Sequence, residues 1–376
     1  SQVSGGPGTS GASAGREADL VDPGEPGTLK KGEDLRDLWV NLRLYDPQGQ
    51  LVAEERVILE QRTAPEPVFC PVVHREGTGE RAGDETGEKT GKGAGECARQ
   101  GYFTTSLSVE DPILWDAEHP LLYRLVTELY RGEEKLETLE KRTGLRQIER
   151  RGNRLYVNGR EVKLRGTCRH EISPRSGRAL TRELIRKDVE LFKEANCNYI
   201  RTSHYPPSAY FLELCDEQGI YVEDEMALAF VAKTTLYSQR DPEQTGRFLS
   251  HFTELLARDY NHPSVIIWSL ANESFGGYNF DLLNRYIHRK DPTRMTKFSY
   301  PMTIQEEHEM PDIWSIHYSE YDTDLGKKRD NVSVGHAPGR DMPVLHDEYI
   351  HVCCYNREEL RRDPAIRTFW GESIRI

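Results

Sequence analysis

The sequence has no long apolar run and carries more acidic than basic residues. No stretch of about 18 or more apolar residues occurs in the 376-residue chain, so no membrane-spanning helix is predicted. Asp and Glu outnumber Lys and Arg by 62 to 50, which gives a formal net charge of −12. Nucleic-acid-binding proteins usually present a clustered basic face. The composition therefore argues against a membrane protein and against a nucleic-acid partner.

Cysteine is also scarce, and the cysteines do not follow a spacing typical of disulfide or metal sites. The seven cysteines show no C-x-x-C spacing, which predicts buried or loop thiols in place of a disulfide framework or a zinc site. The adjacent Cys353-Cys354 pair has no ligand spacing and no sign of activation. The chain opens at Ser1 without the basic, apolar and small-residue succession of a secretory signal, and the compartment is left open.

The first half of the chain changes character twice. Residues 1–36 are rich in Gly, Ser, Pro and charge and are predicted to be a disordered leader. Residues 37–61 alternate apolar and polar side chains around the turn-like Asp46-Pro47-Gln48-Gly49, which predicts a β-hairpin. Residues 74–98 form a Gly/Glu/Lys/Thr-rich insertion, expected to be a solvated loop without phosphate-binding Gly spacing. Together, residues 37–145 are predicted to form one immunoglobulin-like β-sandwich.

From residue 146 to residue 376, strand-like and helix-like patterns alternate. Helices are predicted after Thr181, which can cap a helix, and around Phe248–Leu255, where apolar residues recur at i, i+4 and i+7. The candidate strands are Val162–Gly166, Asn198–Thr202, Ile220–Asp224, Ser264–Leu270, Thr296–Tyr300, Asp312–Ile316 and Pro343–Asp347. This order is typical of the α/β class and predicts a parallel (β/α)₈ TIM barrel, whose chemistry sits at the carboxyl ends of its strands.

Two of these strands end in acidic residues. The buried run from Val265 to Leu270 leads into Asn272-Glu273, and the later strand leads into Glu348. Paired carboxyl groups that flank a sugar are the machinery of glycoside hydrolysis. Taken alone, either residue could equally be an ordinary solvated acid at the junction of a strand and a loop.

Five segments decide between these interpretations, because their order and spacing are specific. They are RTGLRQIERRGNRLYVNGREVKLRG (142–166), YIRTSHYPPS (199–208), GIYVEDE (219–225), NHPSVIIWSLANES (261–274) and MPVLHDEYIH (342–351). Together they resemble glycoside hydrolase family 2, which holds β-galactosidases, β-glucuronidases and β-mannosidases. The resemblance implies that Glu273 is the general acid/base and Glu348 the nucleophile of a retaining enzyme. Their carboxyl groups should then be about 5–5.5 Å apart.

The same resemblance implies roles for other residues near the strand ends. Asn272 would bind the sugar 2-hydroxyl, Tyr318 would hydrogen-bond the nucleophile, and His170 and His204 would contact sugar hydroxyls. Arg201 would orient a carboxylate through its fork, or equally form a structural salt bridge. Without the motif, each histidine would be interpreted as a core residue.

Aromatic residues and metals are less clearly indicated. Trp268 and Trp314 could form the walls of a sugar site or pack within the barrel. Some β-galactosidases of the family bind magnesium through a Glu and a His that follow the third strand, but Asp224–Leu228 contains no His. No metal and no cofactor are therefore predicted.

The sequence predicts a retaining exo-β-glycosidase that acts on a carbohydrate by double displacement, with β-galactosidase first, then β-glucuronidase or β-mannosidase. A homo-oligomer is compatible with the sequence. Only seven strands are visible, and the family's jelly-roll domain is not seen. We therefore expect a C-terminally incomplete barrel, with little activity from residues 1–376 alone. An inactive carbohydrate-binding fragment is the alternative.

Overall fold

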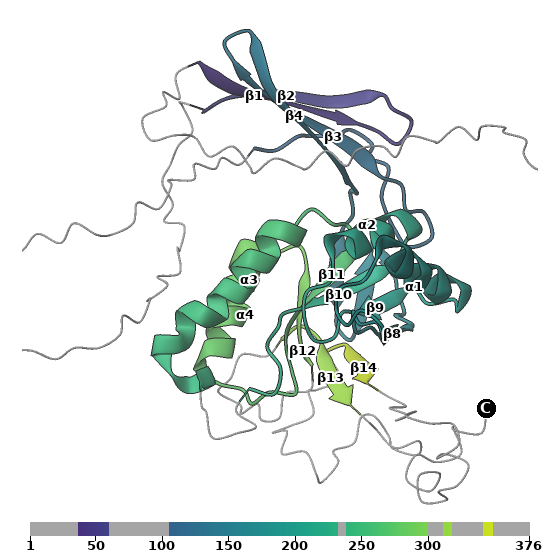
Figure 1. The fold of residues 1–376 in the computed structure, drawn as a ribbon, viewed down its shortest axis with the longest axis vertical. Coiled ribbons are helices and arrows are strands. Elements are labelled where there is room, and N and C mark those ends of the chain that lie inside the picture. The colour runs from purple at the N-terminus through teal and green to yellow at the C-terminus, as the bar shows by residue number, and fades with distance from the viewer. Residues whose placement is uncertain (1–36, 60–104, 232–237, 300–310, 318–340, 349–376) are drawn as a thin grey trace, which may run out of the picture.

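The computed structural model describes residues 37–59, 105–231, 238–299, 311–317 and 341–348. The predicted leader and the 74–98 insertion lie outside these ranges. Figure 1 shows a β-sheet above an α/β body in which helices surround parallel strands. No helix of the described ranges has the length and apolar character needed to cross a membrane.

The N-terminal sheet contains four antiparallel strands in the order β2-β1-β3-β4. Its strands are β1 (Leu38–Tyr45), β2 (Leu51–Ile58), β3 (Tyr123–Arg131) and β4 (Glu134–Thr143). The predicted hairpin is confirmed, because β1 pairs with β2 and the carboxylate of Asp46 accepts hydrogen bonds from the backbone N–H groups of Gln48 and Gln50. Every second side chain of β1 is buried, as the alternation indicated. The strands described within residues 37–145 all belong to this one sheet.

Among the described residues, seven parallel strands build the α/β body. They are β8 (Gly166–Cys168), β9 (Tyr199–Arg201), β10 (Tyr221–Glu225), β11 (Val265–Asn272), β12 (Met295–Ser299), β13 (Trp314–His317) and β14 (Val344–Glu348). The first five form one sheet in the order β12-β11-β10-β9-β8, and β13 pairs with β14. A parallel bridge from Lys297 to Ile313 joins the two sheets. The Cys168 thiol donates to the backbone oxygen of Asp347, which brings β14 back beside β8. The strands therefore follow the wall of a TIM barrel.

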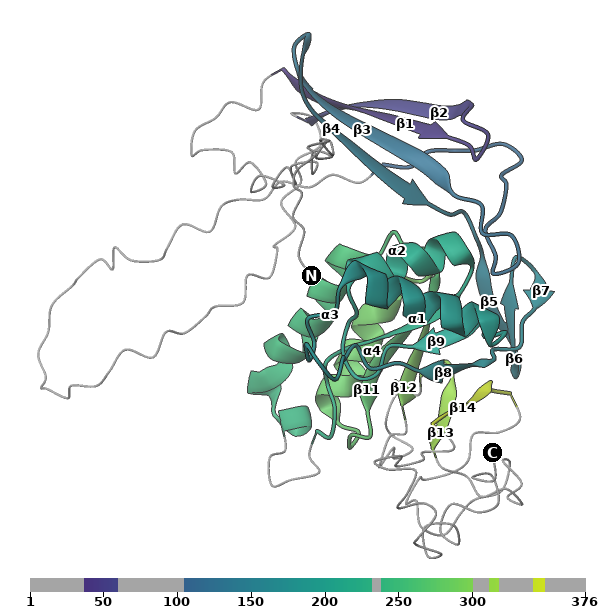
Figure 2. The same cartoon turned by 45° about the vertical axis from the view of Figure 1, so that its right-hand side comes forward.

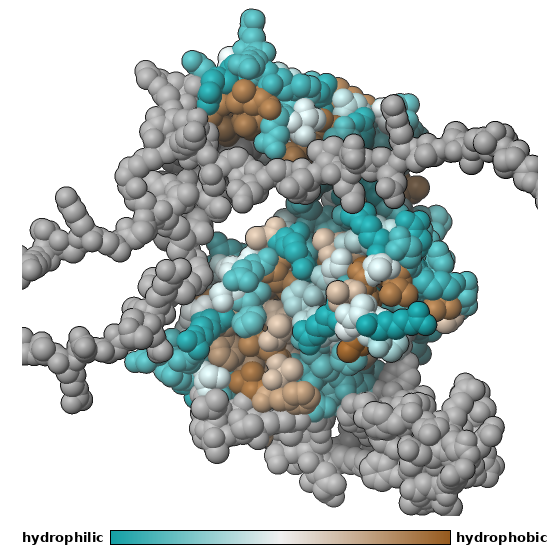
Figure 3. All heavy atoms as spheres, in the orientation of Figure 1, coloured by the Kyte–Doolittle hydropathy of each residue, from teal (hydrophilic) through white to brown (hydrophobic). Residues whose placement is uncertain are grey.

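In the part of the chain that the structure describes, α-helices cover the outer face of these strands (Figure 2). They are α1 (Arg182–Glu194), α2 (Ala209–Gln218), α3 (Thr245–Asp259) and α4 (Tyr278–Lys290), and two 3₁₀ turns, η2 (Ser238–Arg240) and η3 (Pro242–Gln244), precede α3. The hydroxyl of Thr181 accepts from the N–H of Leu184 and caps α1 as predicted. The apolar side of the helices packs with outward-facing strand residues in one continuous core. Figure 3 shows a mostly hydrophilic outer surface with apolar patches.

A small sheet closes the amino end of the barrel. It contains β5 (Ile148–Arg151), β6 (Arg154–Val157) and β7 (Arg160–Glu161), and its residues pack with Trp115 against the bottom of the strands. The prediction of a first barrel strand at Val162–Gly166 was wrong, because Val162 and Leu164 pack into this floor and the strand begins at Gly166. A Cβ at Gly166 would lie 1.6 Å from the Tyr199 backbone oxygen, so only glycine allows this approach.

Candidate active site

The interior of the barrel is layered from apolar to charged. Successive side chains of a strand point to opposite faces, so every second residue points inward. At the amino end these residues are Tyr199, Tyr221, Ile267, Met295 and Ile313. Nearer the carboxyl ends of β9, β10, β12 and β14, the inward-facing residues are charged and buried: Arg201, Glu223, Glu225, Lys297 and Asp347. The apolar layer thus supports a charged layer at the carboxyl ends of the strands.

Arg201 is the hub of this charged layer. Its Nε and Nη2 atoms donate to the Glu225 carboxylate at 2.7 and 3.0 Å. Nη2 also donates to Asn272 Oδ1 at 2.7 Å, and Nη1 donates to Glu348 Oε1 at 2.7 Å. Burial alone would disfavour the charged guanidinium, but Glu225 and Asp347 hold its pKa well above the ordinary value. One side chain therefore fixes groups from β10, β11 and β14.

Lys297 occupies the neighbouring position on β12. Its ammonium group forms ion pairs with Asp347 and, at 2.7 Å, with Glu223. Burial would raise the pKa of Asp347, but Lys297, His317 and Arg201 outweigh it and hold that pKa well below the usual range. Ser315 Oγ also donates to Asp347 at 2.6 Å. Asp347 is therefore a buried, ionised carboxylate at the base of the cleft.

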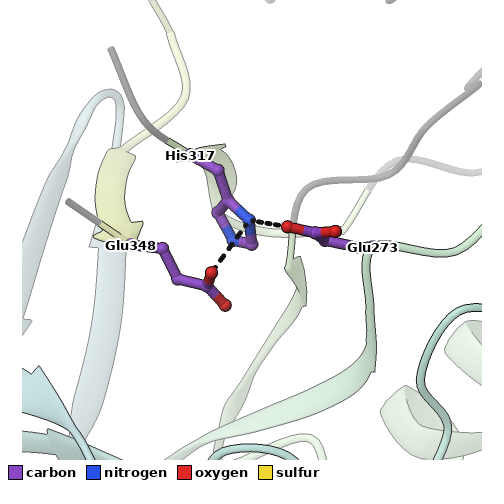
Figure 4. Close-up of side chains that lie close together, drawn as sticks. All are labelled: Glu273, His317 and Glu348. Atoms are coloured by element: carbon purple, nitrogen blue, oxygen red, sulfur yellow. Dashed lines mark hydrogen bonds and ion pairs between the residues drawn. The ribbon is translucent and has the colours of Figure 1, made fainter. Parts of the chain in front are cut away.

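Three side chains converge above this layer (Figure 4). His317 ends β13, and its imidazole lies between the carboxylates of Glu273 and Glu348. Nδ1 is 3.1 Å from Glu273 Oε1 and 3.5 Å from Glu348 Oε2. Each of the three residues has one atom that could bind a metal ion, a carboxylate oxygen or an imidazole nitrogen, and these three atoms lie within 4.8 Å of one another. The two acids singled out by sequence thus meet in one cleft.

The backbone at Glu273 has an uncommon conformation. Glu273 follows β11 directly and has φ +39°, a region that non-glycine residues rarely occupy. Its N–H donates to the Ser299 backbone oxygen at 2.8 Å, which secures this turn to β12. Such turns are often found where a side chain must be aimed into a functional cleft. Here the turn directs the Glu273 carboxylate toward His317.

Two predicted histidines lie on the rim of the cleft. His204 Nδ1 is 2.7 Å from Glu225 Oε1, and its ring packs edge-on against His170 at 5.2 Å between centroids. Burial, with His204 as the next cause, lowers the pKa of His170, so that imidazole is held neutral. Phe230 packs against His204 at 6.4 Å and is 48% exposed. The rim therefore offers two imidazole rings and an aromatic face.

The remaining predicted residues are placed differently. Trp268 is fully buried and donates to Asp291 behind the strand, so it packs outside the barrel interior. Trp314 begins β13 and is three residues, roughly 10 Å, from His317. The described contacts do not bring Trp314 to the carboxylates. Tyr318 lies outside the described residues.

Sequence reasoning did not assign roles to several side chains of the cleft. These are Glu223, Glu225, Lys297, His317 and Ser299. A signal was available, because Glu223-x-Glu225 and Lys297-x-Ser299 repeat polar residues at every second position of predicted strands. Such alternation in a barrel strand predicts side chains that face the interior.

Among the described residues, one group could supply several ligand atoms to a cation. It consists of Glu273, His317 and Glu348. The imidazole already contacts both carboxylates directly, so a shared proton accounts for the same convergence. Cys168 offers no thiolate, because burial raises its pKa to about 12. The prediction that no metal is required stays a prediction.

Comparison with known families covers both parts of the chain. The TIM barrel domain of glycosyl hydrolases family 2 matches residues 148–358, and a second model of glycosyl hydrolases family 2 matches residues 35–146. The first match spans more than half of the chain and contains both Glu273 and Glu348.

Curated relatives include two β-galactosidases. The β-galactosidase BgaC of Bifidobacterium adolescentis is 34% identical over 258 residues, which cover 65% of this chain and 24% of the relative. The β-galactosidase of Yersinia enterocolitica is 39% identical over 205 residues, 53% of this chain and 20% of that relative. The chain therefore spans about a fifth to a quarter of the length of these relatives.

Solved structures give the same architecture. An FMN-binding β-glucuronidase from Facaelibacterium prausnitzii is similar at TM-score 0.57 and 25% identity, over 75% of this chain and 38% of that chain. A β-glycosidase from Bacteroides vulgatus is similar at TM-score 0.54 and 25% identity, over 76% of this chain and 31% of that chain. Both alignments cover about three quarters of the present chain.

Proposed function

Because this chain belongs to glycoside hydrolase family 2, we propose that it acts as a retaining exo-β-glycosidase through Glu273 and Glu348. The observation that carries the proposal is the separation of the two acids, since one carboxylate oxygen of Glu273 lies within 4.8 Å of one carboxylate oxygen of Glu348. Retaining enzymes place their carboxyl groups about 5–5.5 Å apart, whereas inverting enzymes need roughly 6.5–9.5 Å for an intervening water. The observed spacing supports direct attack by a carboxylate.

The proposed reaction has two displacements. Glu348 attacks the anomeric carbon while Glu273 gives its proton to the departing glycosidic oxygen, which forms a covalent glycosyl-enzyme. Glu273, now ionised, removes a proton from water, and the resulting attack releases the sugar from Glu348. The charge-assisted bond from Arg201 Nη1 to Glu348 Oε1 holds the carboxylate of the proposed nucleophile and fixes its direction.

Asn272 is suited to the sugar hydroxyl next to the reacting carbon. Its Oδ1 atom accepts from Arg201, which leaves the amide nitrogen as the group that can donate to a 2-hydroxyl. A bond of this kind strengthens as the transition state develops. His170 and His204 on the rim are proposed to contact other hydroxyls, and Phe230 to cover an apolar face of the ring.

The proposed glycone is a neutral sugar, with β-galactosides first. The relatives at 34% and 39% identity are β-galactosidases. The two buried cations Arg201 and Lys297 are already paired with acids, so a uronate would add a carboxylate to an acidic cleft. β-Glucuronides and β-mannosides are the alternatives within the family, and a panel of aryl β-glycosides separates the three.

The test of the nucleophile is Glu348→Gln in the full protein. We expect turnover to fall by several orders of magnitude for every substrate, because an amide cannot form the glycosyl-enzyme. Glu190→Gln on the exposed face of α1 is the matched control and should keep normal rates. A mechanism-based fluoro-sugar should label Glu348, as shown by mass spectrometry of the labelled peptide. Labelling of Asp347 would overturn the assignment.

The test of the acid/base is Glu273→Ala. Substrates with poor leaving groups should lose most activity, while an activated aryl glycoside should still form the intermediate and then stall. Azide should rescue the stalled step and yield a β-glycosyl azide. An azide product of inverted configuration contradicts the proposal. If the unaltered protein binds sugars but shows no turnover, the protein is a carbohydrate-binding module instead.

A further inference from the structure

We propose that His317 shares a proton with Glu273 and exchanges it with that carboxylate during turnover. His317 is thereby a positioning residue that keeps the acid/base supplied with a proton. This inference rests on the glycosidase reaction proposed above. It goes beyond the two carboxylates by assigning a third titrating group to the cleft.

The orientation of the imidazole is the first support. Nδ1 faces both catalytic carboxylates, at 3.1 Å from Glu273 and 3.5 Å from Glu348. The other ring nitrogen, Nε2, faces Asp347 Oδ1 at 3.4 Å. Asp347 is held ionised by Lys297, and its negative charge 3.4 Å from Nε2 favours a hydrogen on that atom. The ring atom that gains and loses a proton is therefore Nδ1, the atom nearest Glu273.

The charge of the surroundings is the second support. The groups that face His317 or its partners are Glu273 after β11, Asp347 and Glu348 on β14, Lys297 on β12, Arg201 on β9 and the neighbouring His346. Burial alone would lower the pKa of His317, but Asp347 and Glu273 reverse the effect and raise it. Three carboxylates around one ring thus favour retention of a proton between them.

The same conclusion follows from the wider charged layer. Glu223 and Glu225 are already matched by Arg201 and Lys297. Asp347, Glu348 and Glu273 then bring three further acidic groups to the ring of His317. Several like charges at such distances cannot all ionise without compensation. A proton held by the pair formed by Glu273 and His317 supplies that compensation.

The proton movements balance over one cycle. Before the first displacement, the Nδ1–H bond breaks as an O–H bond forms on Glu273, so the imidazolium becomes neutral and the carboxylate becomes a carboxylic acid. Glu273 then transfers this proton to the glycosidic oxygen. In the second displacement Glu273 takes a proton from water and passes it to Nδ1, which restores the imidazolium. No further reactant is needed.

The test is the pH dependence of kcat/KM in His317→Asn. Asn fills the place of Nδ1 with an amide that does not titrate, so the basic limb should belong to Glu273 alone. We expect this limb to move toward lower pH by about one unit or more. His288→Asn is the matched control, because His288 forms a similar pair with Asp312, at 2.8 Å, on α4. A chelator in every assay separates proton sharing from cation binding.

A second measurement does not require turnover. In ¹³C-histidine-labelled protein, the His317 resonance should titrate above about 6.5, and in Glu273→Gln its midpoint should fall because a carboxylate partner is lost. An unshifted basic limb in folded His317→Asn, or an unchanged midpoint in Glu273→Gln, overturns the inference. Failure of the glycosidase proposal would appear separately, as absence of turnover in the unaltered protein.

Discussion

Arg201 shows how one residue can meet two expectations. From sequence it was predicted either to orient a carboxylate or to form a structural salt bridge. Its contacts include both, since the bidentate pair with Glu225 lies within the wall and the bond to Glu348 reaches into the cleft. The planar fork of arginine permits this, whereas a lysine would offer a single point charge.

Asp224 provides a test of buried charge on the opposite side of the strand. It points away from the barrel interior, is fully buried, and lies near Asp259, which is paired with Arg258. Burial and then the charge of Asp259 raise the pKa of Asp224 well above its ordinary value. Its ionisation therefore destabilises the fold as pH rises. Asp224→Asn should stabilise the protein at pH 8 by about 1 kcal/mol or more.

The measurement is urea unfolding followed by circular dichroism at pH 5 and pH 8. The stabilisation should be larger at pH 8, because the folded protein keeps Asp224 protonated at the lower pH. Asp281→Asn on α4 is a partly exposed control and should change the unfolding free energy little. An equal or larger gain at pH 5 would contradict the assignment.

At the scale of the element, periodicity predicted most of what formed. Strands β9 to β14 and helices α1 and α3 lie close to their predicted positions. The two helices repeat apolar residues at i, i+4 and i+7, and strand β11 is a continuous run that is buried on both faces. The first strand was misplaced, since Val162 and Leu164 look like strand residues but pack into the floor. A short apolar run does not reveal which partner will cover it.

Trp115 tests the connection between the N-terminal sheet and the barrel. It is fully buried, its Nε1 donates to the Asp216 backbone oxygen, and it packs against Tyr221 at the bottom of the barrel. Trp115→Ala should lower the free energy of unfolding by about 3–5 kcal/mol, because it leaves a large cavity. In thermal unfolding, the lower stability of Trp115→Ala should appear as a lower midpoint for the unfolding transition of the barrel.

The control for this change is Trp39→Ala in β1. Trp39 stacks on Tyr130 at a partly exposed position of the N-terminal sheet, so its removal should affect that sheet and cost less. Equal effects of the two substitutions on the barrel would show that Trp115 has no special part in joining the domains.

For the whole molecule, the sequence predicted the class of fold and the two acids but not the charged layer below them. Glu273 and Glu348 were found because they belong to motifs that resemble a known family. No role was assigned to Lys297 or Asp347. These two residues pair with each other but are 50 positions apart, and only the curvature of the sheet brings them together. Pairing across a barrel depends on register, which a single sequence does not state.

The buried charges also set the pH range of stability. The pKa of Glu225 and that of Asp347 are lowered despite burial, by Arg201 and Lys297 respectively, so their stabilisation is full above about pH 4 and lost as pH falls further. The pKa values of His317 and Asp224 are raised, so their stabilisation is full at low pH and lost as pH rises. The opposite signs predict greatest stability under mildly acidic conditions.

Thermal midpoints measured from about pH 3.5 to pH 9 should therefore pass through a maximum near pH 5–6. His317→Asn should flatten the alkaline side of this curve, and it should also weaken the acidic side slightly because His317 helps to lower the pKa of Asp347. A thermal midpoint that rises continuously to pH 9 would show that the raised pKa values of His317 and Asp224 do not affect the stability of the protein.

The bond between Arg201 and Glu348 also bears on how the protein is made. Its two residues are 147 positions apart, so at elongation rates of about 5–20 residues per second the arginine leaves the ribosome roughly 7 to 30 s before its acid partner. During this interval Glu223 and Glu225 can neutralise Arg201 and Lys297 within the nascent sheet. The growing chain is thus protected from an uncompensated charge, and the cleft gains its second acid only when the last described strand has been translated.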